Sequence, residues 1–286
     1  MTRTVDAELG AAGVFGAEHR RLLGYLQRAR GDGPAPETSA LRERYTDDVR
    51  ATAVGTWRLR MVNEHRSSGV FAGLHGAMME CGSAFAVQTT VLRMALDEVH
   101  HAELCGRVVA AFGGAPRAEA EAVPASVPRH TGVSPLESAM RNALFVGCLA
   151  ETVAVALVSH ERSLATEPLV RWTLDQILGD EVSHARFGWT FVRDALPGLG
   201  VEAVVRTNAY LRVAFGYLEA AEHTFLPVAD DPSAELAAQR EALGLCRGQD
   251  ARDLFADTVR TVIVPQLGEL GLDAASAWSG RRRMAA

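Results

Sequence analysis

Two short segments of the chain repeat one pattern of acidic and histidine residues. The first reads Leu96-Asp-Glu-Val-His-His-Ala102, and the second reads Gly179-Asp-Glu-Val-Ser-His-Ala185. Each contains Glu-x-x-His. On a helix, positions i and i+3 share a face, so one carboxylate and one imidazole can bind the same metal ion. Two such helices facing each other across a bundle could hold two ions, and the residues in question are Glu98, His101, Glu181 and His184.

A pair of helices joined by ordinary Glu–His hydrogen bonds is the alternative interpretation of this spacing. The Asp before each Glu and the Ala after each His make a chance repeat the weaker explanation. The pair Asp97-x-x-His100 has the same spacing as the motif. The second segment carries Ser183 where the first has His100, which favours Glu98 and His101 as the metal ligands.

The composition of the 286 residues is that of a soluble globular protein, with 48% hydrophobic and 22% charged residues. A net charge of −6 gives no basic surface for nucleic acid. We expect neither a signal peptide nor a membrane span. No Cys-x-x-Cys pair is present, which excludes zinc-ribbon and rubredoxin-type iron sites and fits reduced thiols in the cytoplasm. The cysteines are Cys81, Cys105, Cys148 and Cys246.

Helical periodicity dominates the chain, and strand patterns are nearly absent. Residues 1–45 predict a short helix near 14–29 and a Gly/Pro breaker run, which we interpret as an amino-terminal arm or packing helix. We expect one domain over 1–286, with a four-helix metal-binding core at 46–196 and additional helices at 197–286. The predicted core helices span 47–80, 84–112, 135–163 and 167–195, and the later ones span 201–226, 232–246 and 249–270.

The connections between the predicted core helices differ in length. A short break at Cys81-Gly82-Ser83 supplies a terminal glycine and a new cap. Residues 113–134 contain prolines and are too long for a tight turn, which is typical of a crossover connection. Ser134-Pro135-Leu136-Glu137 is a helix start with a capping box. In the last predicted helix, Pro265 predicts a kink or a stop.

Two neighbouring metal ions need more carboxylates than the two motifs provide. Antiparallel helices joined at the 81–83 break place Glu64 level with Glu98. A turn near residue 166 places Glu151 level with Glu181. Glu151 stands in an apolar run, where a buried carboxylate is costly unless it is paired or metal-bound. The alternative is a surface position on a poorly amphipathic helix.

Over residues 47–195, the pattern formed by the two Glu-x-x-His motifs and the two further glutamates resembles the ferritin-like diiron-carboxylate superfamily. The resemblance implies an all-α fold, namely a ferritin-like four-helix bundle with a long crossover between helices two and three and extra carboxyl-terminal helices. It implies two iron ions, with manganese or a mixed Fe/Mn pair as alternatives. Two glutamates would bridge or flank the ions, each histidine would bind one ion, and the other two glutamates would cap the outside. The implied ligands are Glu64, Glu98, His101, Glu151, Glu181 and His184.

The aspartates before the motif glutamates match a further feature of this family. Family members often place an Asp there that hydrogen-bonds to the histidine of the opposite helix. The resemblance therefore implies contacts of Asp97 with His184 and of Asp180 with His101, which would orient each imidazole. The alternative is a polar residue that faces a neighbouring helix.

Departures from particular family members narrow the expected activity. Cys105 stands where radical-generating reductase subunits usually have tyrosine, and Ile177 stands where aryl-amine N-oxygenases have a further histidine. The chain is also longer than the small iron-storage members. We expect an O2-activating oxidase or oxygenase that acts on a small organic substrate, with an electron donor and with a homodimer as one possible assembly. Alternatives are a manganese catalase, a non-enzymatic iron-binding or storage protein, and a scaffold without ions.

Four residues near the predicted ligands are candidates for a substrate pocket. Gly147 and Cys148 lie one turn before the third-helix ligand, where small side chains would leave room for dioxygen or substrate. Cys105 lies one turn after the first motif. Arg60 lies one turn before Glu64. It could form a salt bridge to Glu64 or to a carboxylate at the bundle end, or it could anchor a substrate carboxylate.

Overall fold

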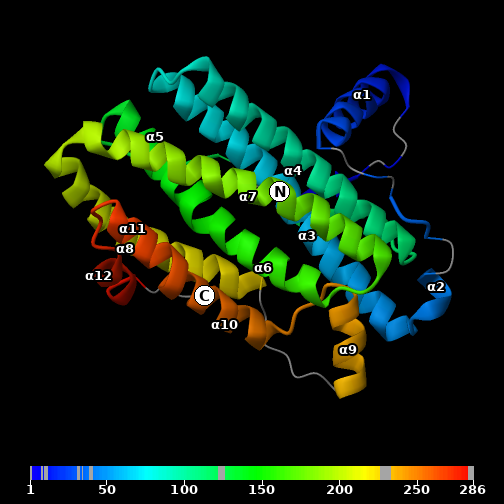
Figure 1. Ribbon diagram of the computed structural model, residues 1–286. Coiled ribbons are helices and arrows are strands. Elements are labelled where there is room, and N and C mark those ends of the chain that lie inside the picture. Colours follow the sequence, from blue (N-terminus) through cyan, green and yellow to red (C-terminus); the bar gives the residue numbers. More distant parts are fainter. Residues whose placement is uncertain are drawn as a thin grey trace.

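The computed structural model describes residues 2–282 apart from 8, 10–11, 31–32, 34, 39–40, 122–125 and 226–232. The chain is mostly helical, as predicted, and its long helices run side by side along one axis (Figure 1). The third long helix is continuous through three segments, of which the middle one is π-helical. The long helices are α3 (Asp47–Glu80), α4 (Phe85–Ala111), α5–η1–α6 (Pro135–Ala143, Leu144–Ala150 and Glu151–Leu164) and α7 (Pro168–Ala195).

Local sequence signals set the ends of these helices within a residue or two of the predicted bounds. Gly82 takes a φ of 70° between α3 and α4, a conformation that favours glycine. The Ser134 Oγ accepts a hydrogen bond from the Glu137 backbone N–H at 3.2 Å, so the predicted cap of α5 is present. Pro168 occupies the first turn of α7, where its missing N–H costs nothing.

A small sheet departs from the prediction of a chain nearly without strands. Strand β1 (Thr2–Asp6) pairs antiparallel with β2 (Arg117–Glu121), with Thr2 opposite Glu121. Alanine fills alternate positions of β2 and is a weak strand former, so local propensity gave only a weak signal for this pairing. The sheet attaches the amino-terminal segment to the long connection between α4 and α5.

The rest of the amino-terminal segment lies outside the long helices (Figure 1). It contains α1 (Gly13–Arg30), close to its predicted span, and the short α2 (Leu41–Arg44). His19 of α1 lies 2.8 Å from a carboxylate oxygen of Glu103 on α4. Leu23 and Leu26 of α1 are buried. The segment is therefore packed against the bundle by both apolar and polar contacts.

The carboxyl-terminal helices pack along the α5–α6 side of the bundle (Figure 1). The predicted third helix of this group is continuous through a π-helical segment, so Pro265 does not stop it. A proline ring clashes with the carbonyl four residues earlier, and that carbonyl lies in the widened π turn. The elements are η2 (Leu196–Leu199), α8 (Val201–Phe225), α9 (Ala234–Ala242), α10 (Gly248–Thr258), η3 (Val259–Ile263), α11 (Val264–Glu269) and α12 (Ala274–Ser279), the last of which was not predicted.

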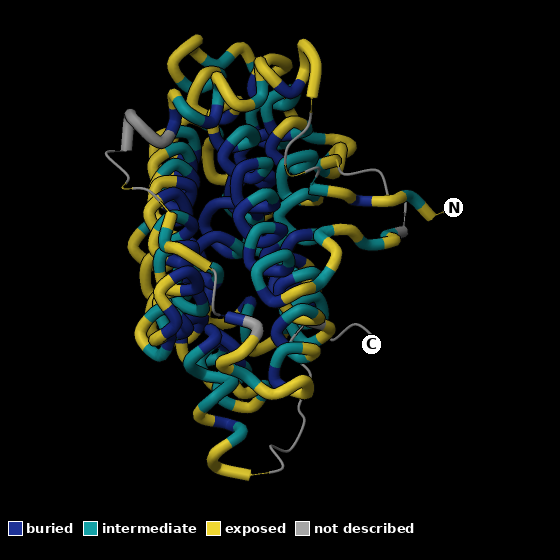
Figure 2. The backbone as a smooth tube through the Cα atoms, turned by 90° about the vertical axis from the view of Figure 1, so that its right-hand side faces the viewer, coloured by how far each residue is buried: buried dark blue, intermediate teal, exposed yellow. Residues whose placement is uncertain are grey.

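Two apolar clusters fill the bundle, one toward each end. Buried residues lie along the interior of the bundle (Figure 2). On α3, Met61 belongs to one cluster and Phe71 to the other. On α7, Ile177 and Val192 are divided in the same way. The predicted metal ligands fall between these positions on each helix. The bundle therefore has a polar layer between two apolar ends.

The helix Pro135–Leu164 is long and apolar enough to cross a membrane by length and composition, although we expected no such segment. Leu144, Leu149 and Val153 from this helix belong to an apolar cluster of the bundle. Its apolar character thus has a packing role in the core.

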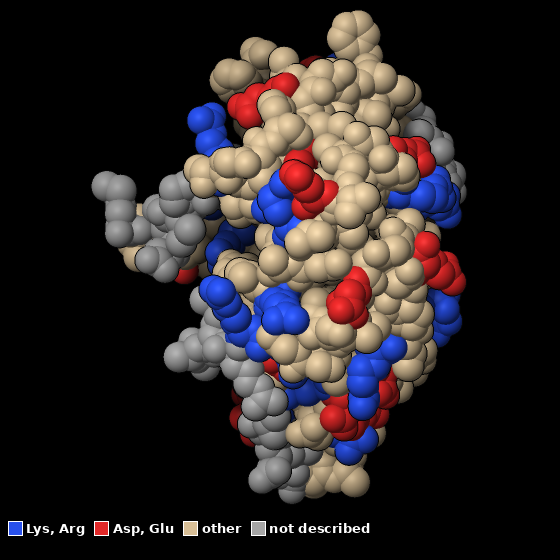
Figure 3. Space-filling model, turned by 90° about the vertical axis from the view of Figure 1, so that its left-hand side faces the viewer, with Lys and Arg blue, Asp and Glu red and all other residues tan. Residues whose placement is uncertain are grey.

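On the face shown in Figure 3, acidic and basic side chains are interspersed.

Candidate metal centre

The structure brings the six predicted ligands together in the polar layer of the bundle. Their ligand atoms form two overlapping groups, and within each group all atoms lie within 4.8 Å of one another. Glu98 and Glu181 belong to both groups. These two glutamates hold the central position expected of bridging carboxylates. The groups are Glu64, Glu98, His101 and Glu181, and Glu98, Glu151, Glu181 and His184.

The two histidines hold equivalent places in the two groups. The Nδ1 atom of His101 lies 3.5 Å from Oε2 of Glu64 and 3.6 Å from Oε1 of Glu181. The Nδ1 atom of His184 lies 3.1 Å from Oε1 of Glu98 and 3.3 Å from Oε2 of Glu181. Both imidazoles are buried. Each Nδ1 therefore faces a set of carboxylate oxygens, as a metal ligand would.

Four buried atoms in this layer make no hydrogen bond among the described residues. They are Nδ1 of His101 and His184, Oε1 of Glu98 and Oε2 of Glu181. Leaving buried polar atoms unpaired is costly, and native proteins rarely do so. A cation among these atoms would satisfy all four, and carboxylate with imidazole is a donor set that suits iron, manganese and zinc. The cluster could therefore hold metal ions.

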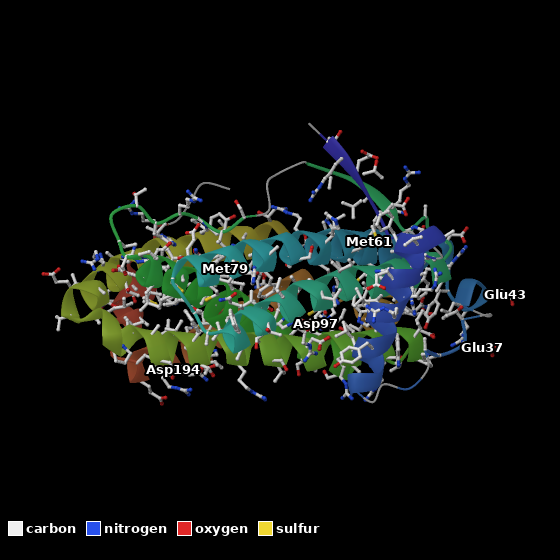
Figure 4. All side chains as sticks on the ribbon, turned by 90° about the horizontal axis from the view of Figure 1, so that it is seen from above. Glu37, Glu43, Met61, Met79, Asp97 and Asp194 are labelled. Carbon is white, nitrogen blue, oxygen red and sulfur yellow. The ribbon has the colours of Figure 1, made fainter. Side chains whose placement is uncertain are left out.

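Aspartates on the opposite helices contact the far side of each imidazole. Asp180 Oδ2 lies 3.1 Å from His101 Nε2, and Asp97 Oδ2 lies 3.4 Å from His184 Nε2. An imidazole that donates its Nε2–H to a carboxylate carries its free lone pair on Nδ1, which faces the glutamates. The expected cross-bundle contacts are present, and they favour this tautomer in both rings. Asp97 lies near the middle of the bundle length (Figure 4).

Arg93 is a residue that the sequence analysis missed. Its Nε lies 3.2 Å from Asp97 Oδ2, and its Nη2 donates a hydrogen bond of 3.1 Å to Asp180 Oδ1. One guanidinium on α4 therefore links both aspartates, and through them both histidines. A signal was present, because Arg93 precedes Asp97 by one helical turn. The contact with α7 was not visible in the sequence.

Burial and mutual repulsion govern the protonation of the glutamates in the metal-free state. Burial and the charge of Glu181 raise the pKa of Glu98 to about 8. Burial and Glu181 also raise the pKa of Glu151 well above its ordinary value. Burial acts in the same direction on Glu181, but contacts with Glu151 and His184 outweigh it and lower its pKa to about 2. The cluster therefore retains protons that a metal ion must displace.

A cavity of about 750 Å³ connects the cluster with the surface between α3 and α6. Its inner end is formed by Glu64, Glu98, Glu151 and Glu181, and its outer part includes residues of α8, α9, α10 and the loop before α10. Its volume lies in the range of small-molecule sites. A ligand in this cavity would meet the carboxylates directly.

Of the four predicted pocket residues, only Arg60 lines this cavity. Gly147 and Cys148 do not line the cavity, because Gly147 packs directly against the backbone of Gly188 on α7 and Cys148 is buried in an apolar cluster. Their small size serves close helix packing. Cys105 is likewise buried in the other cluster. Arg60 does line the cavity, and its salt bridge is to Glu161 of α6.

Comparisons with known proteins returned no match. Neither the scan against protein-family models, nor the search of curated proteins, nor the search of solved structures found a similar protein.

Proposed function

We propose that this protein is an O2-activating non-haem diiron oxidase or oxygenase that acts on a small organic substrate. The observation that carries the proposal is the pair of overlapping ligand groups that share Glu98 and Glu181 and open onto a cavity. The ligand pattern resembles that of ferritin-like diiron-carboxylate proteins. Two bound ferrous ions would supply electrons to dioxygen.

The side chains of this chain would hold and orient that chemistry. His101 and His184 would each bind one ion, Glu98 and Glu181 would lie between the ions, and Glu64 and Glu151 would bind on the outside. Asp97 and Asp180 keep each imidazole oriented through its Nε2–H. The two apolar clusters cover the layer toward both ends of the bundle. The cavity leaves one side open for a substrate.

The cavity favours an organic substrate over the alternatives. A storage protein oxidises many irons per site and needs a mineral chamber, and a manganese catalase needs access only for peroxide. A cavity of about 750 Å³ beside the ligands exceeds what peroxide requires. The proposal includes an electron donor that reduces the ions. It also includes an intracellular setting with reduced thiols, in keeping with the four free cysteines.

Metal analysis followed by an oxygen assay tests the proposal. The purified protein is expected to bind two Fe(II) per chain under anaerobic conditions and to consume O2 in an amount proportional to protein. The His184→Ala variant should lose one binding site, whereas His160→Ala, on an outer turn of α6, should match the wild type. Candidate metabolites are then screened for oxidation that is coupled to O2 consumption.

Three results would contradict the proposal. Continued oxidation of excess iron into a mineral would indicate storage. O2 release from peroxide by a manganese-loaded form would indicate a catalase. Absence of metal binding at micromolar concentration would indicate a scaffold.

A further inference from the structure

We infer that the cavity binds an organic monoanion, with Arg60 holding the carboxylate of the substrate and the remainder of the molecule directed toward Glu64 and Glu98. The inference deepens the proposed function and rests on it, because the bound ions would set the charge at the inner end of the cavity. It is carried by the surroundings of a single guanidinium group.

Arg60 is fixed in place with part of its hydrogen-bonding capacity unused. Its Nη2 donates to both carboxylate oxygens of Glu161, at 2.7 and 2.6 Å. Its guanidinium carbon lies 4.8 Å from the ring centroid of Trp57. Trp57 is itself buried, and its indole N–H donates to the Leu243 carbonyl oxygen at 3.2 Å. The Nη1 atom of Arg60 is buried and has no hydrogen-bond partner among the described residues.

A buried guanidinium nitrogen without an acceptor is costly, because it loses water without gaining another hydrogen bond. Burial alone would lower the pKa of Arg60, but the charge and hydrogen bonds of Glu161, together with Cys105 and Glu64, outweigh burial and raise the pKa, so the group keeps its charge. Arg60 lines the cavity. A ligand that supplies an anionic oxygen to Nη1 would complete its hydrogen bonding.

The position of Arg60 sets the size of the ligand. Arg60 and Glu64 are one turn apart on α3, which is an axial distance of about 6 Å. An aryl or short alkyl carboxylate held at Arg60 would therefore reach the glutamates with its far end. The buried Nη1 offers a single nitrogen to a ligand oxygen, which suits a monoanion better than a dianionic phosphate.

The remaining charges of the cavity also favour an anion. Two divalent ions would balance the four glutamates at the inner end. The outer part then contains Arg60, Arg66, Arg240 and Arg247 against Glu161 and Glu222, and Arg247 is also paired with Glu241 and Asp250. Arg66 is exposed and has no ion-pair partner among the described residues. Burial raises the pKa of Glu222 to about 7, so it carries only part of its charge at neutral pH.

Calorimetric titration with benzoate and benzamide tests the inference without measuring oxidation. The protein is titrated as purified and after loading with two equivalents of Zn(II), which cannot react with O2. Benzoate should bind, and its neutral isostere benzamide should bind at least about tenfold more weakly. Arg60→Gln should weaken benzoate binding about 10- to 100-fold and leave benzamide unchanged.

Two further variants separate ligand binding from a structural role of the ion pair. Glu161→Gln should tighten benzoate binding, because it releases Arg60 from its partner and removes a repelling charge. Arg58→Gln is the matched control on the same helix. Arg58 binds the Ala115 carbonyl oxygen at 3.2 Å outside the cavity, so this change should leave affinity unaltered.

The outcomes distinguish this inference from the proposed function. Equal binding of benzoate and benzamide, or equal effects of Arg60→Gln and Arg58→Gln, would overturn the anion site even if metal binds. Weaker benzoate binding by both Arg60→Gln and Glu161→Gln would show that the pair is structural, which also overturns it. Failure to bind Fe(II) would refute the proposed function, while selective benzoate binding that depends on Arg60 would still support the anion site.

Discussion

Replacing Arg93 by methionine should weaken both the fold and the metal centre. The guanidinium lies within 3.2 Å of an oxygen of Asp97 and of Asp180, and these aspartates are the partners of the two histidines. Methionine keeps an unbranched apolar stem and removes the charge. The two buried carboxylates then lose their contact with the guanidinium and keep their contacts with the imidazoles.

The size of the effect follows from these contacts. A hydrogen bond to a charged group contributes about 1.5–3 kcal/mol, so two such contacts set an upper value of about 6 kcal/mol. The Arg93 side chain is 47% exposed, so water and salt screen much of this energy. We expect a loss of about 2 kcal/mol in the free energy of unfolding of the metal-free protein. Loss of such an outer contact typically costs about 10- to 100-fold in metal affinity.

Two measurements on the Arg93→Met variant test this expectation. Urea unfolding in the presence of a chelator gives the stability of the metal-free state, and competition with a chromophoric chelator gives the metal affinity. Arg171→Met, an exposed arginine of α7 with no ion pair among the described residues, is the matched control. If the metal affinities of the two variants agree within about twofold, the link through the aspartates would be refuted.

Three further predictions concern packing, pH and metal binding. Gly188→Ala should destabilise the protein by about 1–3 kcal/mol in urea unfolding, because the new Cβ would lie 2.5 Å from the Gly147 backbone. In the control Gly179→Ala, the new Cβ would meet no neighbouring atom of the described residues within 4 Å, and the change should stabilise the protein by about 0.5–1 kcal/mol. Folding raises the pKa of Glu222 from 4.5 to about 7, so its protonated form is favoured and stability falls as the pH rises through this interval. Glu222→Gln should therefore raise the melting temperature at pH 8 but not at pH 4. The corresponding gain in the free energy of unfolding at pH 8 is at most about 3 kcal/mol. Addition of metal should release protons in an unbuffered titration, because Glu98 and Glu151 have raised pKa values, and no release would contradict the protonation described above.

The sequence predicts those features that follow from helical periodicity. Glu98 and His101 share a face because they are three residues apart, and the repeat of their motif identifies the second helix. The antiparallel turns then place Glu64 and Glu151 at the same level, where the structure has them. Helix bounds were predicted closely because glycine, proline and serine mark the ends.

Features that depend on contacts between distant segments were not predictable in this way. The pairing of β1 with β2 joins residues more than a hundred positions apart and has only a weak local signal. Arg93 was overlooked because its second partner, Asp180, belongs to another helix. Gly147 was assigned to a pocket because small size was taken as empty space, yet its lack of a side chain lets the backbone of Gly188 approach. A small residue in a bundle helix can indicate either an open pocket or close packing of two helices, and the residue opposite it on the facing helix determines which of the two occurs.

The geometry of the centre follows from packing that needs no ions. On α3, buried Trp57 and Phe71 lie on either side of Glu64 and fix the rotation of the helix. On α6, the π-helical turn immediately before Glu151 changes the rotation of that helix where the ligand begins. The apolar ends therefore hold the unpaired atoms of the polar layer in place at a cost in stability. Such a cost persists where function needs it, and metal binding is the function that would offset it here.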